Sequence, residues 1–403
     1  MLLKGDSLVE LKKIKDETVD MVYLDPPFFT QKTHSLKSKE DKVYSFNDIW
    51  SDINSYKDYI QLRLKECQRV IKPTGSIFLH CDRSASHYLR IALDEVFGYD
   101  NFRSEIVWYY RRWSNAKKGL LNSHQLIFFY SKTKEFKFNT FFTDYSPTTN
   151  LDQIFQKRVR GKNGKTTYKK SSKGETELMN GKQGVPLLDV WEIPYLNPKA
   201  KERVGYPTQK PILLLERIIS ISTDVGDLVL DPFCGSGTTL VAAKILDRKF
   251  IGIDISNEAI QLAKSRISQP IKTKSALLEK GRNAYLNQDS QILSWLESID
   301  CQPVQRNKGI DGFLRINGMV KPIPVKIQRE GESFTVARKR LISAAKKNGY
   351  ERKILIRSPN MIGIQLNFQE FEELNNEKLI IVNNLDKFIK NKEHFISEIL
   401  DQS

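Results

Sequence analysis

The chain has 403 residues, of which 40% are hydrophobic and 28% are charged, and its 64 Lys and Arg against 48 Asp and Glu give a formal charge of +16. It contains no run of about 18 apolar residues and no hydrophobic signal region at its start, which excludes a membrane-spanning class and favours a cytoplasmic protein. Four scattered cysteines without a CxxC pair exclude a disulfide scaffold and a zinc site, so no metal is expected.

The first part of the chain alternates between strand-like and helix-like segments. Thr18–Asp25 alternates and is rich in β-forming residues, so we predict a strand that ends at Asp25. Apolar residues at helical spacing over Ser55–Ile71 predict a helix, which "KPTG" should stop before a strand begins at Ser76. The same reasoning predicts a helix at 84–98 and strands at 104–112 and 124–132.

A dense basic stretch from Arg111 to Lys182 follows, with the aromatic residues Trp113 and Tyr168 interleaved. Its second half is poor in large apolar residues, which predicts a long mobile loop that orders on a ligand. Neutralised phosphates release counterions, so the charge favours a nucleic-acid contact over a merely solvated basic surface. The predicted DNA-contacting residues are Arg111, Arg112, Trp113, His124, Lys157, Arg158 and Arg160.

The alternation then resumes with a helix at 210–223, a strand at 227–231, a helix at 237–246, a strand at 249–255 and a helix at 257–267. Repeated strand–helix units predict an α/β fold. We expect a doubly wound, mostly parallel, Rossmann-like sheet covered by helices on both faces, with an insert and a small second α/β domain. The chain is long enough to bury the two cores that this requires.

The glycine turn in "LVLDPFCGSGTTLVAA", Leu228–Ala243, is typical of a nucleotide-type site. An apolar strand runs into Asp231, and Thr238 and Thr239 open a helix whose free N–H groups attract a negative group. The spacing is neither GxGxxG nor GK[ST], which disfavours a dinucleotide pyrophosphate or ATP phosphates. The next strand ends at Asp254, where a carboxylate can accept hydrogen bonds from two ribose hydroxyls. The pattern predicts a ligand with a ribose and a small carboxylate.

Two motifs together resemble a known family. "DPFCGSGTT" is similar to the S-adenosylmethionine-binding motif of DNA amino-methyltransferases, and "DPPF" after the first strand is similar to their catalytic motif. The catalytic motif comes first here, with the basic region between the two, which is the order of the circularly permuted β group. "GDS" at Gly5–Ser7, "VIKPTGSIFLH" at Val70–His80 and "YPTQKP" at Tyr206–Pro211 support the resemblance, which covers roughly residues 1–270.

The resemblance implies catalytic roles that chemistry supports. The amino group of a base is a poor nucleophile because its lone pair is delocalised into the ring, so acceptors aimed at its N–H bonds would raise its reactivity. The Asp25 carboxylate and the Pro26 carbonyl would be those acceptors, and Pro27 restricts the backbone that presents them. An exposed Phe28 would stack on an extruded base, whereas Phe29 is as readily expected to pack under the loop.

The resemblance also implies S-adenosylmethionine as the cofactor. Asp254 would bind its ribose, and Lys210 would lie near its carboxylate, where a cation is physically sensible. Asp6 would lie near the adenine end, with an acid that caps an N-terminal turn as the alternative. The residues that would line or flank the methionine part are Asp231, Phe233, Gly235, Gly237, Thr238 and Thr239.

The implied substrate is duplex DNA, in which the target base must be flipped out to reach Asp25. An acid at the first motif position goes more often with N6-adenine than with N4-cytosine in this family, so adenine is favoured and cytosine is the alternative. An RNA substrate is a weaker alternative to duplex DNA. Members of the group often pair as dimers and act beside a cognate restriction endonuclease, so both are candidate partners, and no membrane partner is expected.

The end of the chain predicts a separate domain. "KGIDGFLRINGMVKPIPVKIQ", the amphipathic segment Ser333–Gly349 and "KILIRS" resemble the core of the PD-(D/E)xK nuclease fold, with Asp311 as the first metal ligand. A second acid is needed two residues before Lys326, because alternate strand residues share a face, but Pro324 stands there. We therefore predict a degenerate nuclease-like fold used for DNA contact or dimerisation. A bifunctional methyltransferase-endonuclease and a catalytically silent DNA-binding module are the alternatives.

These patterns divide the chain into four regions. We predict the catalytic half of a methyltransferase domain at 1–110, a basic target-recognition region at 111–200, a cofactor-binding half at 201–275 and the nuclease-like domain at 285–403.

Overall fold

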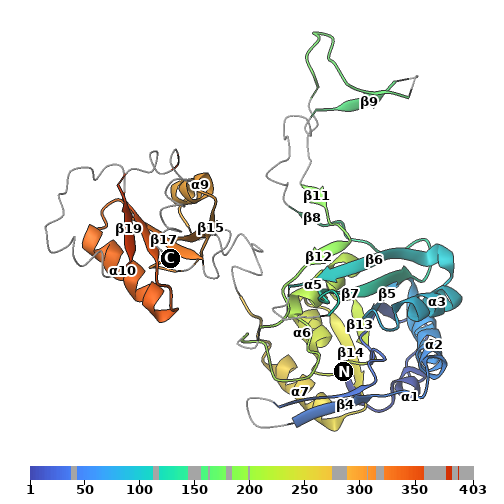
Figure 1. Ribbon diagram of the computed structural model, residues 1–403. Helices are drawn as coiled ribbons and strands as arrows, with labels where there is room; N and C mark the ends of the chain where they lie inside the picture. The colour runs from blue at the N-terminus through green and yellow to red at the C-terminus, as the bar shows by residue number, and fades with distance from the viewer. Residues whose placement is uncertain are drawn as a thin grey trace. The chain divides into compact units, whose positions relative to one another are not determined.

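The computed structural model forms two compact units, Met1–Leu278 and Glu279–Ser403 (Figure 1). Hydrophobic clusters lie within each unit, three in the first and two in the second. Among the described residues, no helix is long and apolar enough to cross a membrane. The described residues are 1–37, 43–111, 118–143, 156–161, 164–177, 184–197, 200–274, 288–305, 307–314, 322–357, 378–383 and 389.

The first unit is built around an eight-stranded sheet with the strand order β1-β14-β13-β2-β5-β7-β6-β12. Within these described strands, β7 runs antiparallel to both neighbours and all other pairs are parallel. The bounds of the strands are β1 Leu2–Lys4, β2 Val19–Leu24, β5 Ile71–Cys81, β6 Phe102–Tyr109, β7 His124–Ser131, β12 Val190–Glu192, β13 Leu228–Asp231 and β14 Lys249–Asp254.

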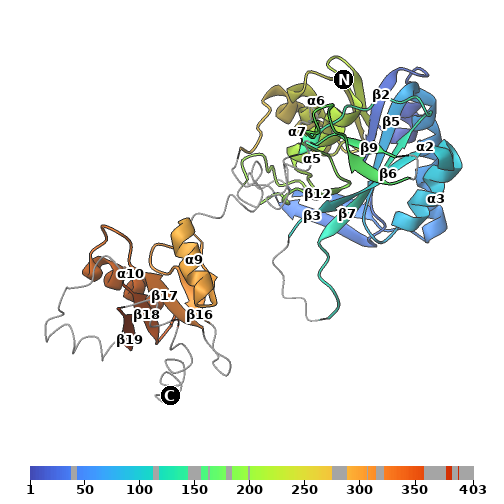
Figure 2. The same ribbon diagram turned by 90° about the horizontal axis from the view of Figure 1, so that it is seen from above.

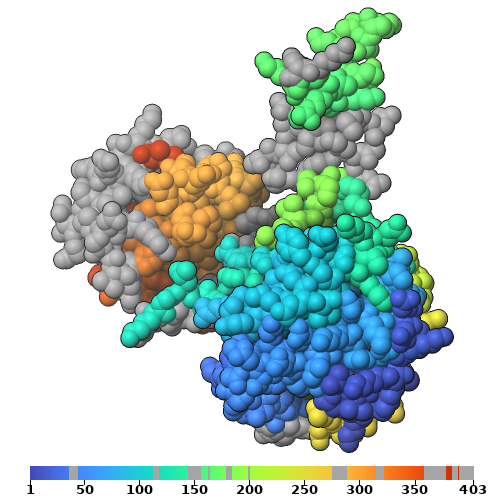
Figure 3. Space-filling model, turned by 90° about the vertical axis from the view of Figure 1, so that its right-hand side faces the viewer, coloured from blue at the N-terminus to red at the C-terminus, as the bar shows by residue number. Residues whose placement is uncertain are grey.

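Helices cover both faces of this sheet (Figures 1 and 2). On one face lie α1 Ser7–Leu11, α2 Ile53–Val70 and α3 Ser86–Phe97, and Figure 3 looks onto the blue-to-cyan surface to which they contribute. On the other face lie α5 Ile212–Ser222, α6 Thr238–Ile245 and α7 Asn257–Ser268. Strand β2 is buried throughout, with Val22 and Leu24 in the first layer and Met21 and Tyr23 in the second. The predicted doubly wound α/β fold is therefore confirmed.

The boundary between α2 and β5 differs from the prediction. The strand begins at Ile71, directly after the helix, so "KPTG" lies inside it rather than before it, and that prediction was wrong. Pairing with β2 is irregular between Val19 and Met21, which leaves room for a proline that cannot donate to the ladder. A Cβ on Gly75 would lie 2.7 Å from the Asp20 carbonyl, so only glycine permits this close approach of the two backbones.

Two strands of the main sheet, β7 and β12, lie inside the predicted recognition region 111–200. The described chain between them forms two further antiparallel pairs. The basic stretch is thus not a plain loop where it is described, so that part of the prediction was wrong, whereas its ordering on a ligand stays a prediction. The pairs are β8 Phe142–Thr143 with β11 Val185–Pro186, and β9 Arg158–Arg160 with β10 Thr166–Tyr168.

A short hairpin and a 3-10 turn complete the first unit. The hairpin pairs β3 Lys32–Lys37 with β4 Val43–Asp48, and the turn η1 spans Tyr99–Asn101. Because β3 follows the "DPPF" segment directly, the hairpin folds back toward the end of β2 and brings Asp48 to that segment.

The second unit is a small α/β domain with a five-stranded sheet in the order β15-β16-β17-β18-β19. The first three strands are antiparallel, and β17, β18 and β19 are parallel, with α10 connecting β17 to β18. The bounds are α9 Ser290–Ser298, β15 Cys301–Pro303, β16 Gly312–Leu314, β17 Ile323–Ile327, α10 Phe334–Lys347, β18 Lys353–Ile356 and β19 Leu379–Val382.

Candidate active site

Three carboxylates meet at one edge of the main sheet. Asp25 follows β2, Asp231 ends β13 and Asp254 ends β14, and these three strands are parallel neighbours. The carboxyl ends of parallel strands lie together, and ligands of doubly wound sheets bind outside those ends. A cavity of about 410 Å³ opens there, and all three acids line it.

The glycine turn between β13 and α6 closes one side of this cavity. Gly237 has φ +77° and caps α6, and a Cβ on it would lie 2.7 Å from the Cβ of Ala263, so the turn requires glycine. The N–H of Gly235 donates to Oδ2 of Asp254 at 2.9 Å, and the N–H of Ser256 donates to Oδ1 at 2.8 Å. Burial raises the pKa of the Asp254 carboxyl, which these hydrogen bonds oppose. They orient the acid toward the cavity that it lines.

Asp231 lies deeper in the same turn. It is buried and accepts a 3.0 Å hydrogen bond from the N–H of Phe233. Burial raises its pKa to about 7, although the hydrogen bonds from Thr239 and Phe233 favour the ionised form. The acid therefore fixes the start of the turn from within.

Asp48, at the end of β4, organises the "DPPF" segment. Its carboxylate accepts hydrogen bonds from the N–H groups of Phe28 at 3.1 Å, Phe29 at 3.0 Å and Thr30 at 2.8 Å, and from the indole of Trp50 at 2.9 Å. Phe29 has φ +62°, a strained conformation for a residue other than glycine. Several charge-assisted hydrogen bonds to one carboxylate hold this strained backbone in a single shape.

Phe28 is buried, with 9% of its surface exposed, so the expectation of an exposed ring was wrong. Its ring centroid lies 5.6 Å from that of His80, and the Lys210 ammonium lies 5.1 Å from the ring centroid. Phe29 packs against Tyr56, whose hydroxyl donates to the Pro27 carbonyl at 2.7 Å. The segment is thus packed from below, and Phe28 still contributes to the wall of the cavity.

Asp25 is the acid on which the site converges. Lys210 forms an ion pair with its Oδ2, and the Lys210 side chain is 6% exposed and the Asp25 side chain 17% exposed. Its Oδ1 is buried and has no hydrogen-bond donor among the described residues. Burial raises the pKa of the Asp25 carboxyl above its ordinary value, and the Lys210 ammonium limits that rise. The site therefore holds one buried carboxylate oxygen that a ligand donor could satisfy.

A hydrogen-bonded chain lies behind this oxygen. Nδ1 of His80 is 3.8 Å from Oδ1 of Asp25 and 2.7 Å from the hydroxyl of Tyr23, and its Nε2 is 2.9 Å from Oε1 of Gln125. Burial, and then the nearby Lys210 ammonium, lower the pKa of His80 well below its ordinary value. A neutral imidazole bonded at both nitrogens supports the wall beneath Asp25 without adding charge.

A second cavity of about 360 Å³ adjoins the first. Asp82, Gln125 and Arg203 line only this second cavity, whereas Asp25 lines only the first. Lys210 lines both, so it lies in the wall between them. The residues common to both cavities are Phe28, Thr30, His34, Tyr206, Thr208, Gln209 and Lys210.

The loop that carries Lys210 is held by buried polar contacts. The side chain of Gln209 donates to the carbonyl of Glu202 at 2.7 Å and accepts from the N–H of Val204 at 3.0 Å. The carboxylate of Glu202 accepts from the N–H of Ile212 at 3.1 Å, which ties the loop to the start of α5. These contacts fix the position of the Lys210 side chain in the wall between the two cavities.

The structure brings most of the predicted site residues to the first cavity. Asp6 is not among its lining residues, since it caps α1 and pairs with Arg63 at 2.7 Å, and Gly237 shapes the turn without lining it. Reasoning from sequence missed Asp48, whose only local signal is an acid at a strand end. The predicted residues that line the cavity are Asp25, Pro26, Pro27, Phe28, Lys210, Asp231, Phe233, Gly235, Thr238, Thr239 and Asp254.

The predicted DNA-contacting residues are scattered through the first unit. Arg111 and His124 are exposed, the latter at the start of β7. Arg112 and Trp113 lie outside the described residues. Lys157, Arg158 and Arg160 belong to the segment that contains β9, and all three are exposed.

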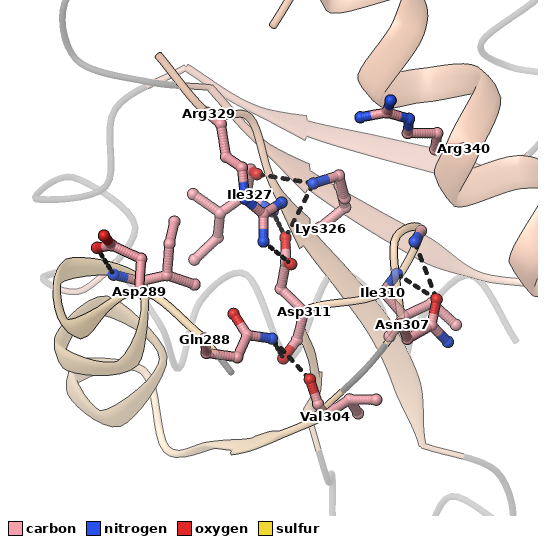
Figure 4. A network of polar contacts seen from close by, with 12 residues as sticks. Gln288, Asp289, Val304, Asn307, Ile310, Asp311, Lys326, Ile327, Arg329 and Arg340 are labelled. Atoms are coloured by element: carbon pink, nitrogen blue, oxygen red, sulfur yellow. Dashed lines mark hydrogen bonds and ion pairs between the residues drawn. The ribbon is translucent and has the colours of Figure 1, made fainter. Parts of the chain in front are cut away.

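Asp311, which would be the first metal ligand of a complete nuclease site, is paired with cations of the protein itself (Figure 4). Oδ2 of Asp311 accepts from Nζ of Lys326 at 3.2 Å and from the N–H of Ile327 at 2.8 Å, and Oδ1 accepts from Arg329 at 2.8 Å. Lys326 also lies 3.4 Å from Glu332. Among the described residues, no cluster of three or more His, Cys, Asp or Glu side chains could hold a metal ion.

Comparison with known proteins gives a consistent result. The model of the family N6_N4_Mtase, described as DNA methylase, matches residues 19–265. The Type II methyltransferase M.HpaI of Haemophilus parainfluenzae is 33% identical, over 66% of this chain and 73% of that protein. The Type II methyltransferase M.HinfI of Haemophilus influenzae is 30% identical, over 66% and 68%. The DNA adenine methyltransferase YhdJ of Escherichia coli (strain K12) is 31% identical, over 66% and 82%.

Proposed function

The chain belongs to the DNA methylase family N6_N4_Mtase, whose model spans more than half of it, and on this premise we propose that it transfers a methyl group from S-adenosylmethionine to the N6 amino group of adenine in duplex DNA. The observation that carries the proposal is the buried Oδ1 of Asp25, which has no donor among the described residues and lies beside the wall between two cavities. An amino N–H group of a bound base would satisfy it.

The first cavity fits the cofactor. A carboxylate at the end of β14 suits two ribose hydroxyls, and the glycine turn lets a ligand approach the backbone closely. Lys210 lies on the same wall, within reach of an anionic group. When bound, S-adenosylmethionine supplies an electrophilic methyl group on its sulfonium. We assign Asp254 to the ribose and the turn around Gly235 to the methionine part.

We assign the amino group of the target base to the part of the first cavity beside Asp25 and Pro26, and the rest of the base to the adjoining second cavity. Asp25 Oδ1 and the Pro26 carbonyl, to which no described residue donates, would accept the two N–H bonds of the amino group. Drawing on both N–H bonds raises the electron density on nitrogen and aims its lone pair. Phe28 lines both cavities and is packed from behind by His80, so it can present one face of its ring to the base.

Adenine is the base that we favour. A carboxylate rather than a hydroxyl stands at the first position of the catalytic motif, and YhdJ is a DNA adenine methyltransferase by name. The contacts described above would serve the N4 amino group of cytosine equally well, so the product must be identified chemically. A stacked base cannot reach Asp25, and the duplex must therefore release it by base flipping.

The proposal extends to the family subgroup, the partners and the cellular location of the protein. Asp25 precedes the glycine turn at Gly235 in the chain, which supports membership of the permuted β group. A dimer and a cognate restriction endonuclease are the partners that we propose, the second because two relatives carry the name Type II methyltransferase. A cytoplasmic location, where DNA and cofactor are both present, is proposed with them.

We propose that the second unit is a nuclease-like domain without cleavage activity, used for DNA contact or dimerisation. Its element order α9-β15-β16-β17-α10-β18 supports the nuclease-like reading. The Asp311 carboxylate is already engaged by Lys326, Arg329 and a backbone N–H, which leaves little room for a divalent ion. The wild-type protein should therefore leave plasmid DNA uncut in Mg²⁺, and cleavage that Asp311→Ala abolishes would contradict this.

The test of the main proposal is transfer of tritiated methyl groups from S-adenosylmethionine to plasmid DNA, followed by hydrolysis and chromatography of the nucleosides. We expect radioactive N6-methyladenine with the wild type and none with Asp25→Ala, while calorimetry shows that the variant still binds the cofactor. Radioactive N4-methylcytosine would instead show that cytosine is the target base. Cofactor binding without any labelled base would refute DNA as the substrate.

A further inference from the structure

The antiparallel ribbon formed by β9 and β10 is an unusual element, because it has no core of its own (Figure 1). Every described strand residue in it is exposed, including Val159 at 41% and Tyr168 at 39%. None of its described residues belongs to a hydrophobic cluster of the first unit. A two-stranded ribbon of this kind is marginally stable by itself.

One face of the ribbon carries arginines without acidic partners. Arg158 lies opposite Tyr168 and Arg160 lies opposite Thr166, so these four side chains share a face. The guanidinium of Arg158 lies 5.5 Å from the centroid of the Tyr168 ring. Within the described parts of the chain, neither arginine has a carboxylate within ion-pair distance. This face, which we call the arginine face, presents two cations and one aromatic ring to its surroundings.

The opposite face neutralises much of its own charge. Lys169 lies 2.8 Å and Lys157 lies 3.6 Å from the carboxylate of Glu177. The hydrogen bond from Lys169 and the nearby charge of Lys157 lower the pKa of Glu177. Backbone hydrogen bonds also join these three residues. The N–H of Lys157 donates to the carbonyl of Glu177, the N–H of Glu177 donates to the carbonyl of Lys169, and the N–H of Lys169 donates to the carbonyl of Lys157. On this face, which we call the lysine face, the cations are already paired with a carboxylate.

We propose that the arginine face, and not the lysine face, is the surface that contacts duplex DNA, with the ribbon lying in the major groove. The inference rests on the proposed function, in which duplex DNA is the substrate. A major groove about 12 Å wide admits a two-stranded ribbon, whose strands are about 4.8 Å apart. Arginine forks match guanine edges and phosphates, and the groups on this face need not give up an existing carboxylate to do so.

The proposal gives different roles to the three basic residues of this segment that were predicted from the sequence to contact DNA. Arg158 and Arg160 contact DNA, whereas Lys157 is paired with Glu177 on the other face. Tyr168 is the third residue of the contact, because it shares the face and stacks beside Arg158. Sequence reasoning could not separate these roles, since all three cations occur within four consecutive positions and only the register assigns them to faces.

Two double variants that remove the same charge test the proposal in the full-length protein. Arg158→Gln with Arg160→Gln changes the arginine face, and Lys157→Gln with Lys169→Gln changes the lysine face. Fluorescence anisotropy with a fluorescein-labelled 30-base-pair duplex of mixed sequence, at several salt concentrations, gives affinity and its salt dependence. We expect the arginine double variant to bind roughly 30-fold more weakly or worse, and its salt slope to fall by about 1 to 2. The lysine double variant should bind within about threefold of the wild type.

Equal losses in both double variants, or wild-type binding by the arginine double variant, would overturn the proposal. A third variant, Arg158→Lys with Arg160→Lys, guards against an effect on folding: it keeps both charges but loses the arginine forks. It should retain most of the salt slope while losing affinity. Cofactor binding by calorimetry should be unchanged in all three. Methyl transfer by the wild type tests the proposed function separately, because it does not depend on which face of the ribbon contacts DNA.

Discussion

Replacing Lys210 by methionine should move the pH dependence of methyl transfer to higher pH. In the proposed reaction Asp25 acts as an ionised acceptor, so activity is present above its pKa and is lost as the pH falls through that value. Burial raises the pKa of Asp25, and the Lys210 ammonium is the group that opposes the rise. Removing that cation must therefore raise the pKa further and shift the acidic limb of the profile upward.

The structure sets the size of this shift. Only 6% of the Lys210 side chain and 17% of the Asp25 side chain are exposed, so solvent screens their interaction weakly. The weakly screened Lys210 ammonium therefore favours the ionised form of the Asp25 carboxyl, and the variant lacks this effect. On the acidic limb of both profiles, we expect the kcat/KM of the variant to lie about 10- to 1000-fold below that of the wild type.

The assay is methyl transfer to plasmid DNA at saturating cofactor between pH 5 and 9, with Lys210→Arg as the control that keeps the charge. The control profile should overlay that of the wild type after scaling. A Lys210→Met profile that is lower at every pH without any shift would refute the argument, since it would mean that the lysine supports the site without acting on Asp25. A shift to lower pH would contradict it outright.

Three further predictions follow from the same contacts. Asp25→Asn keeps the shape of the side chain but not its charge, so kcat should fall by about 10²- to 10³-fold while the Kd for the cofactor, measured by calorimetry, changes little. Equal loss of cofactor binding would instead make this acid a cofactor ligand. Asp254→Asn loses one of two acceptors for backbone N–H groups as well as its charge, and the Kd should rise by about 10- to 150-fold, corresponding to about 1.5–3 kcal/mol. Lys326→Met leaves Asp311 as a buried charge without its ammonium partner, so urea unfolding of the second unit should show a loss of about 3–5 kcal/mol. A loss below about 1 kcal/mol would mean that Arg329 alone compensates the acid.

The sheet and its helices could be predicted because their signals are local. Apolar runs such as Val19–Leu24 are buried on both faces of a parallel sheet, and the glycine turn after Asp231 marks the start of a helix. Asp25, Asp231 and Asp254 converge because their parallel strands are neighbours that end at one edge, and this strand order was seen only in the structure. For these elements, residue type and spacing contain most of the information.

The rest of the site depends on contacts between distant residues. Asp48 reaches the "DPPF" segment only because β4 folds back on β3, and Lys210 meets Asp25 across 185 positions of sequence. The burial of Phe28 depends on His80, which comes from a third strand. No local pattern marks such pairs. The placement of "KPTG" inside β5 has the same origin, because the neighbouring β2 and not the tetrapeptide decides where the strand begins.

The most direct test of the account is single-molecule sequencing of plasmid DNA from cells that express the protein, beside cells that express Asp25→Ala. We expect N6-methyladenine at one recurring sequence with the wild type and no modification with the variant. Modification that persists in the variant would contradict the central role given to the Asp25 carboxylate. Unmodified DNA from wild-type cells, with cofactor binding intact in the purified protein, would contradict the proposed substrate.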